Sequence, residues 1–206
     1  MTEQFSFPGF DDPPQKPPAQ SKAKAGKPGE TLPYSLFFSL FPRAGDANAV
    51  AELTNTLRLR HGLTGKPLLQ HRLHVTLHDL GNYAEVPQDI VDAAIRAGDS
   101  LAADAFDVVF DCALSYPSGG TYVLSGTEGM RQLTAFRELL GEAMYGQGLR
   151  VKRSFTPHMT LMYDRHPVAE HAIEPVRWVA HEFVLIRSHK GLGKYDLMGC
   201  WPLQNG

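Results

Sequence analysis

The sequence predicts an α+β fold of two similar lobes that face each other across a shared cleft. The first reason is the order of elements, because a strand, a helix and a strand bearing His-x-Thr follow one another twice. The second is the tetrapeptide His-x-Thr-Leu, which occurs at residues 74–77 and again at 158–161. The third is composition: 43% of the 206 residues are hydrophobic, which suits a compact globular unit.

Apolar runs and turn residues define the elements in order. Short apolar runs bounded by Gly, Pro or Asn predict strands, and apolar residues at helical spacing predict helices. The predicted strands cover residues 34–41, 72–80, 106–114, 121–125, 155–163, 182–188 and 195–201. The predicted helices cover residues 46–60, 87–102 and 128–144.

Residues 1–31 differ in composition from the rest of the chain. The stretch FDDPPQKPPAQSKAKAGKPGE is rich in Pro, Lys, Gln and Gly and has no apolar period. Such a segment cannot bury enough apolar surface to offset the entropy lost on ordering. The sequence therefore predicts a disordered tail at 1–31 and a bilobal domain at 32–206.

Charge and cysteine content limit the partners and the location. A formal net charge of −2 gives no general attraction for nucleic acid, although binding one nucleotide end needs only a few local cations. The apolar runs are too short to span a bilayer, and no secretory signal is recognisable, so we expect a cytoplasmic protein without a membrane partner. Cys112 and Cys200 lack metal-ligand spacing and are expected to be reduced thiols. A monomer is the default expectation.

Both His-x-Thr motifs are expected to present a histidine and a threonine on one face of a strand. Side chains two positions apart on a strand share a face. His74 and Thr76 therefore lie together, as do His158 and Thr160, while the intervening residues face the core. Two such surfaces facing each other would enclose two imidazoles and two hydroxyls.

This set of groups suits phosphoester chemistry without a metal ion. One neutral and one protonated imidazole can activate a nucleophile and protonate a leaving oxygen in the same turnover. Threonine hydroxyls can donate hydrogen bonds to phosphate oxygens as charge develops. A single His-x-Thr is common on half-exposed strands, but two copies at matching places in two half-chains favour catalysis.

The paired motifs resemble those of the 2H phosphoesterase superfamily, in its branch of 2'-5' RNA ligases and RNA 2',3'-cyclic phosphodiesterases. The resemblance covers residues 34–203 and includes LFFSLFP, LHVTLHDLG, FTPHMTL and FVLIRS…Y…WPL. It implies an α+β fold of two pseudo-symmetric lobes, each an antiparallel sheet with helices on the outside, that enclose a central cleft. It implies no need for a metal or another cofactor. It also implies opening of 2',3'-cyclic phosphates to 2'-phosphates, and joining or cleavage of 2'-5' RNA linkages by some members.

The resemblance also implies roles for the four motif residues. The first-motif histidine, here His74, is usually described as the proton donor, and the second, here His158, as the acceptor that activates water. Thr76 and Thr160 would hold the phosphate. The residues themselves leave the acid and the base interchangeable, because the site is nearly symmetric. One departure is that Met162-Tyr163-Asp164 follows the second motif, where relatives often carry a basic residue.

Further residues extend the predicted site. Arg72 precedes His74 by two positions and is a candidate phosphate contact, with a surface arginine as the alternative. Tyr163 is a candidate for stacking on a base, although strict alternation directs it away from His158, towards core or edge packing. His78 is expected at the rim on the face of His74. The remaining histidines have no metal-ligand spacing, and no nucleotide-binding glycine motif is present.

Three functions remain in competition, and the third of them is a metal-dependent phosphoesterase, for which sensitivity to a chelator is the test. The first is a metal-independent phosphodiesterase acting on the 2',3'-cyclic phosphate end of RNA or on a cyclic nucleotide, with 2'-5' ligase activity as an extension. The second is a protein that binds an RNA end or a nucleotide in the same cleft without turnover. Two imidazoles favour the enzyme, because binding alone could use Arg or Lys, whereas proton transfer needs groups that titrate near neutral pH.

Overall fold

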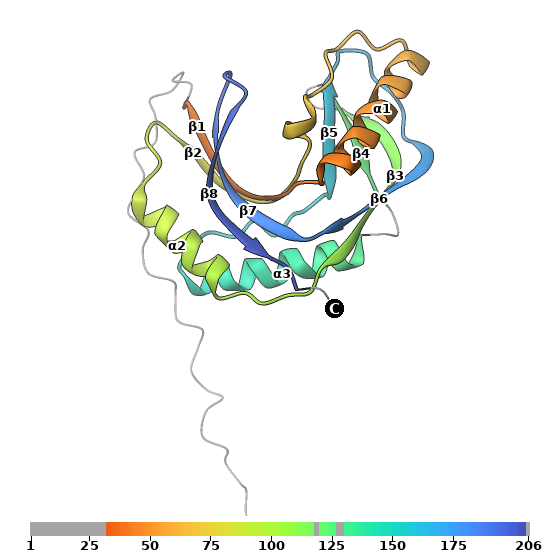
Figure 1. The fold of residues 1–206 in the computed structure, drawn as a ribbon. Helices are drawn as coiled ribbons and strands as arrows, with labels where there is room; N and C mark the ends of the chain where they lie inside the picture. The colour runs from red at the N-terminus through yellow and green to blue at the C-terminus, as the bar shows by residue number, and fades with distance from the viewer. Residues whose placement is uncertain (1–31, 118–119, 127–129, 205–206) are drawn as a thin grey trace, which may run out of the picture.

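A computed structural model describes residues 32–117, 120–126 and 130–204 of the chain. The tail predicted at residues 1–31 lies outside the described residues. The strands form one sheet that bends into a U with two arms (Figure 1). No helix in the described part of the chain is long and apolar enough to cross a membrane.

Eight strands and three α-helices make up the described residues. The strands are β1 (Tyr34–Leu40), β2 (Val75–Tyr83), β3 (Phe106–Tyr116), β4 (Thr121–Ser125), β5 (His158–Tyr163), β6 (His171–Ala180), β7 (Glu182–His189) and β8 (Lys194–Pro202). The helices are α1 (Ala44–Arg60), α2 (Gln88–Asp99) and α3 (Arg131–Gly146), with a single 3₁₀ turn at Gln70–Arg72.

The sheet has the order β6-β3-β4-β5-β2-β1-β7-β8, and every strand pair described is antiparallel. One arm contains β1, β2, β7 and β8, and the other contains β3 to β6. The arms join where β2 meets β5, through the single register pair Val75 and Met159. The α+β prediction is confirmed, and the two predicted sheets are hydrogen-bonded into one.

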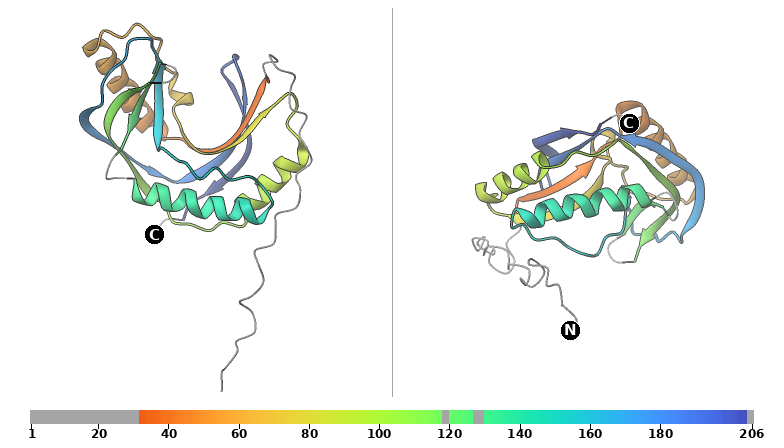
Figure 2. Two further views of the ribbon diagram at one scale, coloured as in Figure 1. Left: turned by 180° about the vertical axis from the view of Figure 1, so that it is seen from behind. Right: turned by 90° about the horizontal axis from the view of Figure 1, so that it is seen from below.

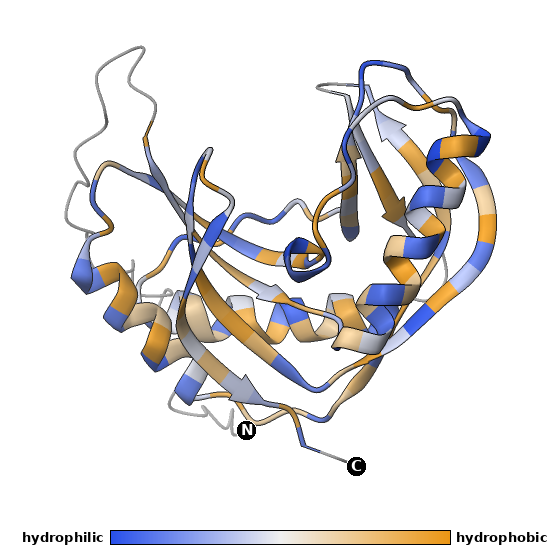
Figure 3. Cartoon of the chain, turned by 45° about the horizontal axis from the view of Figure 1, so that its top comes forward, coloured by the Kyte–Doolittle hydropathy of each residue, from blue (hydrophilic) through white to orange (hydrophobic). Residues whose placement is uncertain are grey.

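The main core lies between the sheet and the helices. In β1, Leu36, Phe38 and Leu40 are fully buried in this core, because alternate side chains of the strand point to its convex side. Helices α2 and α3 lie side by side beneath that convex side (Figure 2), and α1 lies against the outside of the second arm, near β6. The helices show alternating apolar and polar bands in Figure 3, as expected for helices with one buried face.

A smaller apolar cluster lies on the concave side of the first arm. It is formed by Phe37, Val184 and Ile186, with Phe41 and Tyr195 packed against them. Phe37 belongs to the same strand as Phe38 but points the opposite way, so β1 is apolar on both faces. This cluster therefore supplies an apolar wall on the concave side of the sheet.

Strand β6 was not predicted from the sequence. It forms an edge of the sheet, pairs with β3 and contains Pro175. The register skips from Val176 opposite Phe110 to Ala172 opposite Cys112, which leaves Pro175 in an irregular part of the ladder. Proline is tolerated there because an edge position or a bulge does not need its missing N–H.

Candidate active site

The four predicted catalytic side chains meet where the two arms join. Val75 of β2 pairs with Met159 of β5 in an antiparallel register. Val75 and Met159 each lie between the histidine and the threonine of their motif, so this pair brings the two motifs side by side. Besides burial, the charge of His158 contributes to lowering the pKa of His74, so the two imidazoles lie within electrostatic range of each other.

Both motif histidines are held in the same way by their own strands. Nδ1 of His74 lies 2.7 Å from the carbonyl oxygen of Arg72, and Nδ1 of His158 lies 2.8 Å from that of Thr156. A carbonyl oxygen can only accept, so each Nδ1 carries a proton and donates. Each Nε2 is then the nitrogen that can exchange a proton with a bound molecule.

His74 lies in an aromatic environment. Its ring stacks on Phe37 at 5.3 Å and on Phe41 at 5.4 Å between centroids, and it meets the edge of Tyr195 at 5.9 Å. Burial lowers the pKa of His74 below the usual 6.5, although the hydrogen bond to the Arg72 carbonyl opposes this shift. Desolvation therefore favours neutral His74 in the free protein.

His158 is more open than His74. One aromatic ring, that of Tyr116 at the end of β3, meets it edge to face at 5.2 Å. The aromatic neighbours of both histidines were missed in the sequence analysis. Phe37 and Phe41 were assigned to a buried strand without regard to which face they occupy, and Tyr116 and Tyr195 come from strands remote in sequence.

A β-bulge follows each motif at the same place. In β2, Thr76 pairs with Ser39 and His78 with the preceding residue of β1, so Leu77 is the extra residue. In β5, Thr160 pairs with Val123 and Met162 with the preceding residue of β4, so Leu161 is the extra residue. A bulge of this kind reverses the alternation for the residues directly beyond it.

The expectation that His78 lies at the rim, on the face of His74, is wrong. His78 is 3% exposed and points to the convex side, where its Nε2 donates to the carbonyl oxygen of Arg137 in α3 at 2.8 Å. Gly141 of α3 makes room for this ring, because a Cβ there would come within 3.3 Å of it. The bulge at Leu77 is the cause of the reversal.

Burial lowers the pKa of His78 to about 4, which predicts a pH-dependent stability. Below pH 6.5 the unfolded chain binds a proton at this residue, whereas the folded chain stays neutral down to about pH 4. As the pH falls from 6.5 to about 4, we expect the wild type to lose up to about 3 kcal/mol of folding free energy relative to His78→Gln. The glutamine amide can donate a hydrogen bond in place of the imidazole, but it does not titrate. Urea unfolding of both proteins at several pH values measures this, and parallel pH curves would contradict the assignment.

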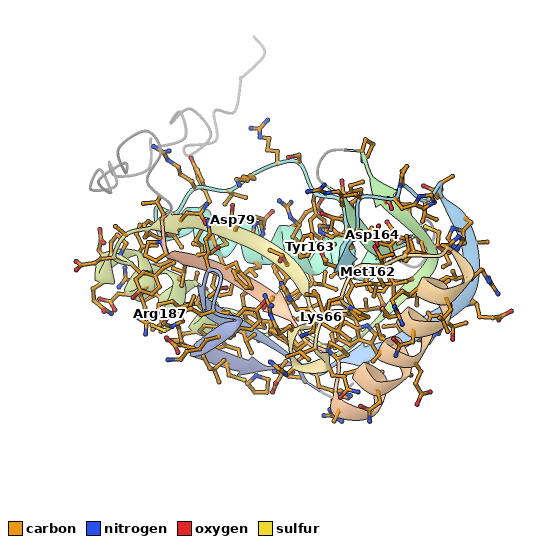
Figure 4. All side chains as sticks on the ribbon, turned by 90° about the horizontal axis from the view of Figure 1, so that it is seen from above. Lys66, Asp79, Met162, Tyr163, Asp164 and Arg187 are labelled. Atoms are coloured by element: carbon orange, nitrogen blue, oxygen red, sulfur yellow. The ribbon has the colours of Figure 1, made fainter. Side chains whose placement is uncertain are left out.

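The bulge has the opposite consequence for Tyr163. Because Tyr163 pairs with Thr121, it returns to the face of Thr160 and His158 instead of alternating away from them. Its side chain is 62% exposed, so the expected core packing is wrong and its ring is accessible. Figure 4, seen from the open side of the U, shows Met162, Tyr163 and Asp164 together at the end of β5.

Arg72 lies close to His74, although not by strand alternation. The predicted strand began at this residue, but Arg72 ends the 3₁₀ turn and β2 begins at Val75. The Arg72 guanidinium lies over the ring of Tyr195 at 5.4 Å, and Tyr195 also contacts His74. The charge of Arg72 is one of the causes that lower the pKa of His74. A cation therefore lies beside the first imidazole.

Asp164 fixes the loop that precedes the first motif to the strand of the second. Its carboxylate accepts hydrogen bonds from the main-chain N–H groups of Thr64 at 2.6 Å, Gly65 at 2.5 Å and His166 at 2.8 Å. These N–H groups, with that of His166 first, hold the pKa of Asp164 below its usual range. Asp164, the residue after Tyr163, therefore has a structural role in this chain.

The described residues contain no group of three or more His, Cys, Asp or Glu side chains placed to hold a metal ion. His61 and His171, which are remote in sequence, do approach each other with 3.2 Å between their Nε2 atoms. They belong to the end of α1 and the start of β6, and the two motif histidines are not part of this pair.

Comparison with solved structures gives the same fold. The crystal structure of E. coli LigT complexed with 3'-AMP is 24% identical, with a TM-score of 0.66 over 84% of this chain and 99% of LigT. A crystal structure described as a phosphoesterase has the same identity and TM-score over 84% of this chain and 100% of its own. The protein TT0787 of Thermus thermophilus has a TM-score of 0.59 at 24% identity, over 83% of this chain and 98% of its own.

Comparison at the level of sequence gives the family. No curated protein matches the chain. A family model described as the 2'-5' RNA ligase superfamily matches residues 42–192, which contain both motifs and the three helices. The matched region is well over half of the 206 residues. With two His-x-Thr motifs joined at the centre of one sheet, this chain belongs to the 2'-5' RNA ligase superfamily of 2H phosphoesterases.

Proposed function

We propose that the protein hydrolyses 2',3'-cyclic phosphate ends of RNA or of nucleotides to 2'-phosphates, with two histidines as acid and base and no metal ion. The observation that supports this proposal is that the two imidazoles make the same hydrogen bond. Each has its Nδ1–H bound to a main-chain carbonyl two residues earlier, and each leaves Nε2 for proton transfer. Binding without turnover would not need two imidazoles prepared in this way.

The proposed reaction opens the cyclic phosphate in one displacement. One neutral imidazole accepts a proton from water at Nε2 as the water oxygen attacks phosphorus. The bond between phosphorus and O3' breaks, and the other imidazole, protonated at Nε2, donates its proton to O3'. The products are a 3'-hydroxyl and a 2'-phosphate. Thr76 and Thr160 donate hydrogen bonds to the non-bridging oxygens as negative charge builds up.

Ligation would use the same groups with a different nucleophile. If a 5'-hydroxyl of RNA takes the place of water, its attack on the cyclic phosphate forms a 2'-5' phosphodiester and again releases O3'. The imidazoles exchange the same protons in both reactions. The family description is consistent with this extension of the proposed activity.

Two further residues are proposed to bind the substrate. Arg72 lies beside His74 and can place its guanidinium near the phosphate. Tyr163 presents an accessible ring on the face of His158 and can stack on a base, for which any base offers a π-face. A cytoplasmic monomer is proposed as the working form.

Hydrolysis of a short RNA ending in a 2',3'-cyclic phosphate, in excess EDTA, tests the proposed function. We expect an RNA ending in a 2'-phosphate, at a rate that EDTA does not change. Tight binding of the same RNA without turnover would support the alternative, a non-catalytic RNA-end or nucleotide-binding protein. Loss of activity with EDTA, restored by added Mg²⁺ or Zn²⁺, would contradict the metal-free mechanism.

A further inference from the structure

Each bulge leaves one main-chain carbonyl outside the sheet ladder, and the two carbonyls are satisfied differently. The carbonyl oxygen of Leu161, in the second motif, accepts a hydrogen bond at 2.8 Å from the main-chain N–H of Leu68. The carbonyl oxygen of Leu77, in the first motif, accepts one at 3.3 Å from Nε of Arg137 in α3. The bulge carbonyl of the first motif is thus satisfied by the side chain of Arg137, and that of the second motif by a main-chain N–H group.

Arg137 reaches both motifs from beneath the sheet. Its Nη2 donates to the carbonyl oxygen of Lys152, and its guanidinium carbon lies 4.7 Å from the centre of the Phe155 ring. Lys152 and Phe155 belong to the segment that connects α3 to β5, which starts at His158. The same guanidinium therefore holds the residue after Thr76 and the segment that leads into the second motif.

The guanidinium of Arg137 donates to main-chain carbonyls. Its residue is 6% exposed, and none of the ion pairs among the described residues includes it. Burial lowers the pKa of Arg137, which shows that the site disfavours the charge. Its own carbonyl oxygen accepts from His78, the residue after the bulge. A buried cation that contacts main-chain oxygens and a ring fixes geometry, because a planar fork of donors tolerates little displacement.

The sheet itself supplies little of this alignment. Strands β2 and β5 share only the register pair of Val75 and Met159. The exposed ion pair of Lys152 with Asp79, at 2.6 Å, adds a second connection but contributes little to stability because both groups are solvated. On the concave-rim side, the hydrogen bonds of Asp164 and of the Leu161 carbonyl connect residues 64–68 to β5, whereas Arg137 connects the two motif regions from the convex side of the sheet.

We propose that Arg137 is a positioning residue that sets the spacing between the two histidine motifs, through the Leu77 carbonyl on one side and the segment 152–155 on the other. This inference rests on the proposed function for its catalytic consequence. It does not assign Arg137 any contact with substrate, because its guanidinium lies on the convex side of the sheet. A displacement of about 1 Å between the acid and the base is enough to cost about 100-fold in rate.

The test compares Arg137→Met, Arg137→Lys and the control Leu133→Ala, which removes a buried side chain one turn earlier in the same helix. All are assayed at a temperature where each is fully folded by circular dichroism. We expect Arg137→Met to lower kcat about 10–100-fold with little change in KM. Arg137→Lys should fall in between, because one ammonium can reach only one of the two carbonyls. The control should keep its kcat.

Amide hydrogen exchange gives a readout that does not depend on the reaction. In Arg137→Met we expect faster exchange in 76–79 and 152–158 together, whereas Leu133→Ala should raise exchange mainly within α3. If the wild type does not open cyclic phosphates, the proposed function fails and hydrogen exchange alone decides the positioning role. Unchanged kcat in Arg137→Met, or unchanged exchange in both segments, would overturn the inference.

Discussion

Replacing His74 or His158 with alanine should reduce hydrolysis of a 2',3'-cyclic phosphate by about 10²–10⁴-fold, towards the limit of detection. Each residue is expected to exchange one proton in the transition state, and neither can take over from the other within one turnover. Because the two act as a unit, the double variant should be little slower than either single variant. Initial rates with a fluorescent cyclic-phosphate RNA measure all three proteins.

The control for this experiment is His71→Ala. His71 is exposed in the 3₁₀ turn, three residues before His74. It should keep the wild-type rate. Because Phe37 and Phe41 pack on His74, His74→Asn is added to keep much of the side-chain volume, and it should be as inactive as His74→Ala. A single histidine variant with full activity would contradict the two-imidazole mechanism.

Alternation along a strand was the basis for predicting that the histidine and the threonine of each motif share a face. His158 and Thr160 both lie in β5, whereas His74 directly precedes β2, which begins at Val75 and contains Thr76. The repeated order of strand, helix and motif strand also predicted the α+β fold, which the structural relatives confirm. Local periodicity and a repeat thus predicted the architecture correctly, and the catalytic role of the four motif residues stays a prediction.

The bulges are what the sequence could not show. Leu77 and Leu161 are apolar residues in apolar strands, and nothing in their identity marks an extra residue in the ladder. A bulge can be recognised only from the strand pairing, because one residue of the partner strand then lies opposite two residues of the bulged strand. Hence the two errors were opposite in kind: His78 was expected at the rim and is buried, whereas Tyr163 was expected to pack and is exposed.

Contacts between remote segments were equally inaccessible to sequence reasoning. Tyr195 of β8 lies against His74, and Arg137 of α3 reaches the carbonyl of Leu77. Each contact depends on how the hairpin of β7 and β8, or the helix, lies on the sheet. An isolated arginine inside an amphipathic helix gives no signal of this kind, because most such residues are solvated.

Removing only the hydroxyl of Thr76 or Thr160, by substitution with valine, should lower kcat by about 10–1000-fold. Valine keeps the β-branched shape, so the strand and its packing are preserved and the missing group is one hydrogen-bond donor. The reason to expect a similar loss from both is the register pair of Val75 and Met159, each of which lies between the histidine and the threonine of its motif. A phosphate between the imidazoles would then have one hydroxyl on each side.

Thr56→Val is the matched control, because Thr56 is exposed on α1 and its hydroxyl donates only to the carbonyl oxygen of Glu52 at 3.1 Å. It should leave the rate unchanged. The symmetry of the site makes the comparison between the two motif threonines informative. Since stabilisation of developing charge acts on the transition state, both losses should appear in kcat more than in KM. A loss confined to one threonine would show that a single motif holds the phosphate oxygens, and it would contradict a site shared equally by both motifs.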